Sequence, residues 1–121
     1  MKAILLIFLG GGTGSVLRYF IGKALNSNIT GIPYGTFLAN ILGSLLIGLI
    51  LGMANKENLV SQNHVLLLAT GFCGGFTTFS TFAYENHLFL KSGDFLSFAL
   101  YTIGSFIVGF FMVFFGMYLT K

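Results

Sequence analysis

The chain has 121 residues, of which 55% are hydrophobic and only 7% are charged. Soluble domains carry about 25% charged residues, so this composition excludes a soluble globular protein and indicates an integral membrane protein. The net charge of +3 is scattered without a basic cluster, which argues against a nucleic-acid partner, and a single Cys excludes an internal disulfide. At about 20 residues per span, the length fits one domain, residues 1–121, of four transmembrane helices.

The first predicted helix covers about residues 3–22. Gly10, Gly14, Arg18 and Gly22 recur at every fourth position and therefore share one helix face. Small residues at this spacing let helix backbones approach closely. Arg18 lies about one turn from the predicted helix end, where it either snorkels to the interface or stands at the mouth of an anion path.

The second predicted helix covers about residues 34–53, after a polar turn at residues 23–32. Every fourth residue on one of its faces is polar or small: Thr36, Asn40, Ser44, Gly48 and Gly52. Such a stripe on a membrane helix faces protein or water and not lipid. The Asn40 amide either donates to an anion or joins two helices, and the first interpretation is slightly favoured.

The third apolar segment covers about residues 65–90 and follows a polar loop at residues 54–63. Its middle, residues 74–78, holds two adjacent glycines, which are poor helix residues, and two threonines, whose hydroxyls favour helix N-caps. The sequence therefore predicts two half-helices that meet near residues 74–78. A broken helix at membrane depth is tolerated where it lines a cavity or binds an ion; a plain glycine kink for packing is the alternative.

Aromatic and polar side chains follow the predicted break. Phe79 and Phe82 are three apart and lie close together on one helix face, and Ser80, Thr81 and Glu85 lie beside them. An ionisable residue inside a membrane segment is a candidate functional residue, although Glu85 could also cap the helix at headgroup level.

The fourth predicted helix covers about residues 95–119, after a tight polar turn at residues 91–94. Tyr101, Ser105 and Gly109 recur on it at every fourth position. The two hydroxyls form a second, weaker polar track on one helix face.

The basic residues are balanced across the membrane. Four helices place both termini on one side with Lys2, Lys56 and Lys121, against Arg18, Lys23 and Lys91 on the other. The positive-inside rule then gives almost no preferred orientation, so the chain can insert both ways and pair as an antiparallel, dual-topology homodimer. A two-fold axis in the membrane plane would bring two copies of the break together, where backbone carbonyls could form a cation site.

Three stretches of the chain resemble the motifs of one known family. Residues 10–19, GGGTGSVLRY, resemble its GGxxGxxxRY motif, and residues 35–43, GTFLANILG, resemble its GTxxxNxxG motif. Residues 71–82, GFCGGFTTFSTF, are similar to its highly specific GFCGGxTTFSTF signature. Together they resemble the Fluc (CrcB-type) fluoride channels over the whole chain.

The resemblance implies a fluoride-selective ion channel and not an enzyme. Two antiparallel pores of a dual-topology homodimer would export fluoride passively across the cell (inner) membrane, with membrane lipid around the dimer. The resemblance also implies a central structural sodium ion, held by the backbone carbonyls of Gly74 and Thr77.

The resemblance also assigns residues to the pore. It places Arg18 and Asn40 in a polar vestibule, and it implies a fourth-helix polar track that Gly109 leaves shorter than in some members. Together with the polar side chains noted above, the expected fluoride pathway comprises Arg18, Asn40, Ser44, Phe79, Ser80, Thr81, Phe82, Glu85, Tyr101 and Ser105.

Three other classes of membrane protein are alternatives to a fluoride channel. A small dual-topology, proton-coupled drug exporter has a similar length, but it needs a carboxylate in an early helix, and the only acids are Glu57, Glu85 and Asp94. A non-transporting scaffold leaves the central break and the polar stripes unexplained. An intramembrane enzyme is disfavoured because there is no His/Cys/carboxylate cluster and no nucleophile–base spacing.

Overall fold

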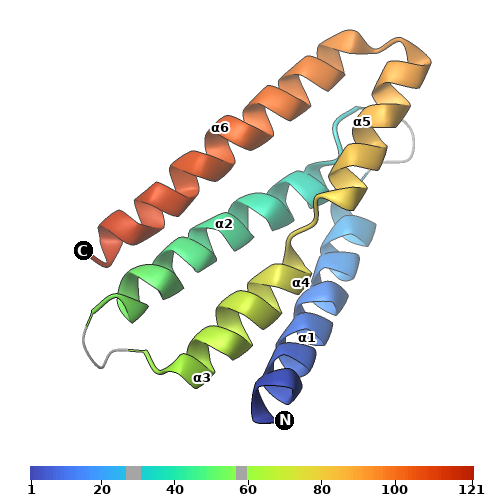
Figure 1. Ribbon diagram of the computed structural model, residues 1–121. Helices are drawn as coiled ribbons and strands as arrows, with labels where there is room; N and C mark the ends of the chain where they lie inside the picture. Colours follow the sequence, from blue (N-terminus) through green and yellow to red (C-terminus); the bar gives the residue numbers. More distant parts are fainter. Residues whose placement is uncertain (27–30, 57–59) are drawn as a thin grey trace.

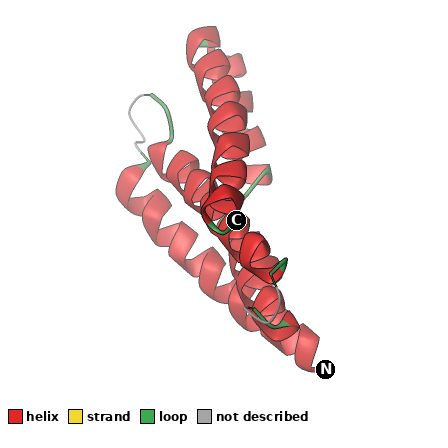
Figure 2. Ribbon diagram, turned by 90° about the vertical axis from the view of Figure 1, so that its left-hand side faces the viewer, coloured by secondary structure: helices red, strands yellow, loops and turns green. Residues whose placement is uncertain are grey.

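The protein is described by a computed structural model that covers residues 1–26, 31–56 and 60–121, and these residues form helices joined by short loops (Figures 1 and 2). In chain order the elements are α1 (Lys2–Leu25), α2 (Tyr34–Ala54), α3 (Gln62–His64), the π-helix η1 (Val65–Cys73), α4 (Gly74–Phe76), α5 (Ser80–Ser92) and α6 (Phe95–Leu119). Four segments are long and apolar enough to cross a membrane, namely α1, α2, the run Gln62–Ser92 and α6. The predicted all-α, multi-pass membrane fold is confirmed. We call Gln62–Ser92 the third span.

The spans lie side by side, with α6 along α2, and η1 and α4 along α1, while α2 packs against both η1 and α1 (Figure 1). The third span runs parallel to α1, and α6 runs parallel to α2, as expected when successive spans cross in alternating directions. The end of α2 and the C-terminus meet, because Lys56 Nζ donates a hydrogen bond of 2.9 Å to the Lys121 carbonyl. Lys56 and Lys121 therefore lie at the same end of the protein, as predicted.

Close backbone contact joins α1 to the third span. A Cβ at Gly10 would overlap the carbonyl oxygen of Leu67, and a Cβ at Gly75 would overlap that of Gly11. Gly14 is likewise buried against the same span. Only glycine leaves room for this approach, which confirms the contact predicted from the spacing of small residues.

The third span is broken at its centre, but not at the glycines. Thr77, with φ −90° and ψ 159°, is extended and separates α4 from α5. The prediction of two half-helices that meet near residues 74–78 is confirmed. The expected cause is wrong, because Gly74 and Gly75 both lie in α4 and Gly75 serves the contact with α1. The π-helical geometry of η1 was not predicted.

The predicted helix limits differ most where polar residues join a helix. The first helix continues to Leu25 and not to residue 22, and the third span begins at Gln62 and ends at Ser92. The tight turn therefore shortens to Gly93, which has a left-handed φ of 82°, and Asp94, which caps α6 by accepting from Ser97 N–H at 3.1 Å. Parts of the two other predicted polar loops, residues 27–30 and 57–59, lie outside the described residues.

Candidate functional site

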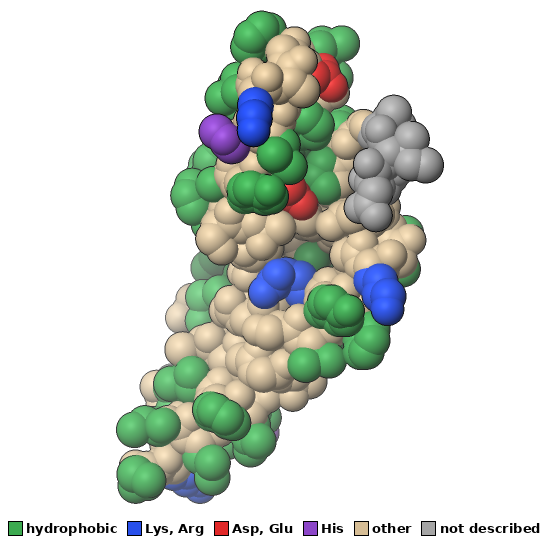
Figure 3. All heavy atoms as spheres, turned by 90° about the vertical axis from the view of Figure 1, so that its right-hand side faces the viewer, with side chains coloured by type: hydrophobic (Ala, Val, Ile, Leu, Met, Phe, Trp, Pro, Cys, Tyr) green, Lys and Arg blue, Asp and Glu red, His purple; other side chains and the backbone are tan. Residues whose placement is uncertain are grey.

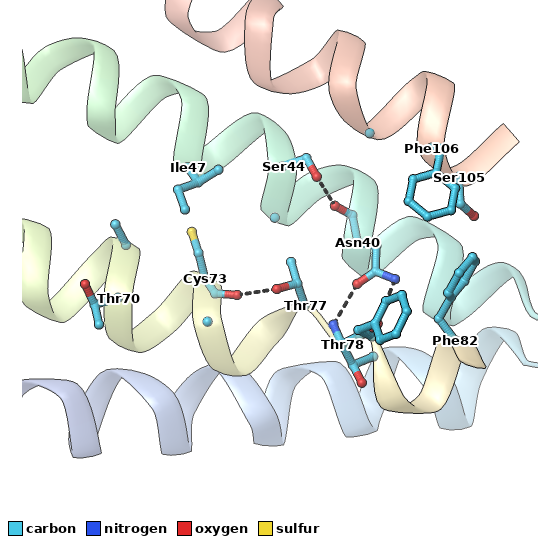
Figure 4. Close-up of a pocket in the computed structure, with 15 residues that line it drawn as sticks. Asn40, Ser44, Ile47, Thr70, Cys73, Thr77, Thr78, Phe82, Ser105 and Phe106 are labelled. Atoms are coloured by element: carbon cyan, nitrogen blue, oxygen red, sulfur yellow. Dashed lines mark hydrogen bonds between the residues drawn. The ribbon is translucent and has the colours of Figure 1, made fainter. Parts of the chain in front are cut away.

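The side chain of Asn40 joins α2 to the break in the third span. Its Oδ1 accepts from the Thr78 N–H at 2.8 Å and its Nδ2 donates to the Thr78 carbonyl at 3.2 Å (Figure 4). In a continuous α-helix the Thr78 N–H would instead bond to the Gly74 carbonyl, four residues earlier. Asn40 therefore satisfies both backbone groups of Thr78, which would otherwise be unpaired at membrane depth.

The Thr78 hydroxyl bonds to the first turn of the second half of the span. Its Oγ1 accepts from the Thr81 N–H at 3.2 Å, as expected of a hydroxyl before a helix, although the N-cap residue itself is Phe79. Thr77 does not act as a cap, because its hydroxyl donates to the Cys73 carbonyl at 2.8 Å. In a continuous helix the Thr81 N–H would have bonded to the Thr77 carbonyl.

The family resemblance assigns the backbone carbonyls of Gly74 and Thr77 to sodium. Neither carbonyl accepts the N–H that would bond to it in a continuous helix. Asn40 takes the N–H that would serve Gly74, and the Thr78 hydroxyl takes the N–H that would serve Thr77. Within the part of the chain that the structure describes, no hydrogen bond outside the regular helices reaches either carbonyl. Free carbonyl oxygens are the kind of ligand that hard cations bind, so this donor set fits a sodium ion.

A cavity of about 590 Å³, open on one side, lies beside the break between α2, the third span and α6 (Figure 4). Five of the predicted pathway residues and both predicted sodium ligands line it: Asn40, Ser44, Phe79, Phe82, Ser105, Gly74 and Thr77. Gly109 lies on the same wall, so the end of the fourth-helix track contributes no hydroxyl there. The Ser44 hydroxyl donates to the Asn40 carbonyl of its own helix at 2.7 Å.

Two phenylalanine rings lie together on this cavity wall. The ring centroids of Phe79 and Phe82 are 5.9 Å apart, which confirms that the two side chains lie close together. Their surroundings differ: Phe79 is 72% exposed, whereas Phe82 is 7% exposed and packs against Tyr101 and Phe106. Phe82 is therefore part of the protomer's packing, and Phe79 is not.

The hydroxyl of Ser105 is unpaired. Its Oγ is buried and has no hydrogen-bond partner among the described residues, although it belongs to a residue of the cavity wall. Most buried hydroxyls are hydrogen-bonded, so this group is available as a donor to a small anion. The hydroxyl of the neighbouring Thr102 is also buried without a hydrogen-bond partner among the described residues, and no sequence pattern pointed to it.

Glu85 links three helices within the membrane-spanning region. Its Oε1 accepts from the Tyr101 hydroxyl and its Oε2 from the Thr36 hydroxyl, each at 2.7 Å. The carboxylate therefore turns inward to α2 and α6, and it does not cap α5 at headgroup level. Thr36, 4% exposed, was noted only as part of a stripe; its position four residues before Asn40 was the signal that could have placed it in the site.

A second cavity, of about 450 Å³, lies on the α1 side of the break. Its lining consists of Arg18, Tyr19, Gly22, Lys23, Asn26, Thr36 and Thr81. Figure 3 shows Lys and Arg side chains beside a hollow on this face. Arg18 does not snorkel outward, because its Nε donates to the Gly75 carbonyl at 3.2 Å.

The predicted pathway residues are thus divided between two places. Arg18 and Thr81 line the second cavity, whereas Asn40 lines the first. Ser80, Glu85 and Tyr101 line neither of these two cavities. Ser80 is exposed, with its hydroxyl 3.4 Å from that of Thr78. Asn40 bonds to the break itself, at Thr78, whereas Arg18 bonds to Gly75 in α4, just before the break.

Comparison with known proteins gives the same family over nearly the whole chain. The family model described as "CrcB-like protein, Camphor Resistance (CrcB)" matches residues 5–117. A protein of Gloeothece citriformis named "Fluoride-specific ion channel FluC" is 51% identical over 100% of this chain and 98% of its own length. Proteins of the same name from Phocaeicola vulgatus and Chlorobaculum tepidum are each 46% identical over 100% of this chain, and over 100% and 96% of their own lengths. The chain therefore belongs to the CrcB-like family, and the relatives it matches are named as ion channels and not as enzymes.

Proposed function

We propose that the protein is a fluoride-selective channel that lets fluoride leave the cell passively through the inner membrane. The observation that carries this proposal is the full-length similarity to relatives named as fluoride-specific channels. The break and the cavities beside it supply hydrogen-bond donors and ring edges that suit the passage of a small anion.

Fluoride is small and strongly hydrated, so a pore must replace its water shell with hydrogen-bond donors. The wall of the larger cavity offers the amide of Asn40, and Ser105 of the same wall holds a buried hydroxyl that has no partner among the described residues. Phe79 and Phe82 offer ring edges, which carry the positive end of the aromatic quadrupole. These contacts are individually weak, as conduction requires, because an ion that is bound tightly is not released.

The channel unit is an antiparallel homodimer with two pores. The larger cavity is open on one side, so a lone protomer would turn the exposed Thr70 side chain and the exposed backbone of Gly74 toward lipid, which is unfavourable at membrane depth. A second copy that covers this face removes the exposure and closes a pathway. The balanced basic residues at the two ends permit the opposed orientation.

A structural sodium ion would lie where the two breaks meet. The Gly74 and Thr77 carbonyls, which have lost their helical donors, would hold it. The described residues contain no group of three or more His, Cys, Asp or Glu side chains that could hold a metal instead. A bound cation would stabilise the dimer as any ligand of the assembled state does.

Fluoride efflux from loaded liposomes tests the proposed function. Purified protein is reconstituted into liposomes filled with potassium fluoride, valinomycin is added, and external fluoride is followed with an electrode. We expect rapid fluoride release, and no release above that of protein-free liposomes when chloride replaces fluoride. Equal release of both anions would contradict fluoride selectivity. Release that depends on a proton gradient would instead support an exporter.

A further inference from the structure

Asn26, at the end of α1, is tied to the start of α2. Its Oδ1 accepts from the Gly35 N–H at 2.7 Å and from the Thr36 N–H at 3.2 Å, and its Nδ2 donates to the Thr36 hydroxyl oxygen at 3.2 Å. Because two backbone N–H groups face the Oδ1, the amide has only one orientation that satisfies both. The contact is close: a Cβ at Gly35 would lie 2.8 Å from Asn26 Oδ1.

This fixed amide determines the direction of the next hydrogen bond. A threonine hydroxyl has one hydrogen, and an amide NH₂ group cannot accept it. Since the Thr36 oxygen receives the Asn26 Nδ2–H, the Thr36 hydrogen must be directed to its other neighbour, Glu85 Oε2, at 2.7 Å. The opposite oxygen of Glu85 receives the Tyr101 hydroxyl at 2.7 Å. The chain of donors therefore converges on Glu85 from both sides.

One end of this hydrogen-bond chain lies in the wall of the second cavity, and the other end is buried beside a ring that lines the larger cavity. Asn26 and Thr36 belong to the wall of the second cavity, together with Arg18 and Thr81. Tyr101, the last donor, is 1% exposed and packs against the ring of Phe82, which lines the larger cavity. The network thus spans the protein between the two cavities.

We infer that Asn26 is a positioning residue for fluoride permeation, which acts through Thr36 to hold the Glu85 carboxylate in place as an acceptor of two hydroxyl donors. Tyr101 is buried behind Phe82, so a fluoride ion that displaces the Phe82 ring from it competes with Glu85 for the same hydroxyl hydrogen. While Thr36 holds the second carboxylate oxygen, Glu85 keeps its position during this exchange, and Tyr101 returns to it after the ion has passed. This inference rests on the proposed fluoride channel function.

The substitution Asn26→Asp removes the hydrogen-bond donor, Nδ2–H, and keeps the acceptor oxygen. A carboxylate oxygen still accepts from the Gly35 and Thr36 N–H groups, and its charge suits the start of α2, so the helix connection is kept. However, Thr36 then has an acceptor on each side and only one hydrogen. We expect about tenfold slower fluoride efflux, which corresponds to about 1.4 kcal/mol and is close to the contribution of one hydrogen bond to a charged group.

A charge placed near the second cavity could also slow fluoride by repulsion, and a double-substitution cycle separates the two effects. Asn26→Asp is combined with Thr36→Val, which lacks the hydroxyl, and with Thr36→Ser, which keeps it. We expect Asn26→Asp to cause no further loss of efflux in the Thr36→Val background and the full loss in the Thr36→Ser background. The same loss in both backgrounds would overturn the inference in favour of simple repulsion.

The infrared spectrum of Glu85 provides a readout that does not depend on transport. The carboxylate stretching band of Glu85 is obtained as the difference between each protein and the same protein with Glu85→Gln. We expect Asn26→Asp to shift this band where residue 36 is Thr or Ser, and not in the Thr36→Val background. An unshifted band would overturn the inference even if efflux falls. A shifted band with no fluoride efflux by the unsubstituted protein would refute the channel function and leave the network intact.

Discussion

Asn40 and Thr78 are 38 residues apart in sequence, yet the Asn40 side chain is hydrogen-bonded to both the N–H and the carbonyl of Thr78. The bond lengths are 2.8 Å to the N–H and 3.2 Å to the carbonyl. Asn40 thereby joins α2 to the break, and it also lines the larger cavity. Asn40 was predicted either to link two helices or to donate to an anion. The two roles are compatible, because the side chain that forms the link also lines the cavity.

Asn40→Asp is expected to lower both fluoride flux and stability. A carboxylate can still accept from the Thr78 N–H, but it cannot donate to the Thr78 carbonyl and it adds a negative charge to the cavity. We expect a loss of about 1–3 kcal/mol in the free energy of unfolding and at least about tenfold slower efflux, which corresponds to about 1.4 kcal/mol. Asn55→Asp, at an exposed site just after α2, is the control for added charge. Normal flux by a dimeric Asn40→Asp protein would leave Asn40 as a link only.

Phe79→Ile and Phe82→Ile are expected to have the same effect on flux and different effects on stability. Each keeps apolar bulk and removes a ring edge from the cavity, so each should slow fluoride. Phe82 is buried against other rings, and its replacement should also destabilise the protein by about 1–3 kcal/mol. Phe79 is 72% exposed in the protomer, so Phe79→Ile should leave the protomer's packing unchanged. Unchanged flux in both variants would refute a role for the ring edges.

Dual topology predicts that one position can be labelled from both sides of the membrane. Asn55→Cys places a thiol at an exposed site at the end of α2, while the native Cys73 is 2% exposed. We expect a membrane-impermeant maleimide to label about half of the protein from outside sealed vesicles and the rest only after permeabilisation. The unsubstituted protein serves as the control for Cys73. Labelling from one side only would contradict the opposed orientation.

Removal of sodium is expected to weaken the dimer. The proposed ion is held by backbone carbonyls, so no side-chain substitution removes it, and exchange of sodium for N-methyl-D-glucamine is the direct test. We expect both the thermal stability of the dimer and the fluoride flux to fall, and both to recover when sodium returns, because a ligand of the assembled state stabilises that state. If neither quantity changes after sodium loss has been verified by elemental analysis, the break binds no structural cation.

The apolar spans could be predicted from local sequence, but the cause of the break could not. The predicted second and fourth helices end within one residue of α2 and α6, because apolar periodicity and flanking polar residues define such spans. The break was expected near residues 74–78 because the adjacent glycines there are poor helix residues and the threonines after them favour helix N-caps. In the structure, Asn40 captures the N–H of Thr78, a contact that depends on how α2 packs and that local propensity does not contain.

The candidate site shows the same limit. Asn40, Ser105 and the two phenylalanines could be placed in it because their types and spacing are unusual for a membrane helix. Asn26 could not, since an asparagine after a helix is ordinary turn chemistry. Its significance comes from α2, whose first N–H groups it accepts, and from the buried Thr36 hydroxyl beyond them.

Gly10, Gly14 and Gly75 bring backbone against backbone, so the joint between α1 and the third span immobilises few side chains, among them Ser15 and Arg18, which donate to the Gly75 carbonyl. At the three glycines no side-chain entropy is lost on folding, and no rotamer change there can loosen the joint. The other half of the span meets α6 largely through side chains, such as the rings of Phe82 and Tyr101. Thermal motion should accordingly concentrate between α5 and α6, while α1, η1 and α4 move as a single rigid body.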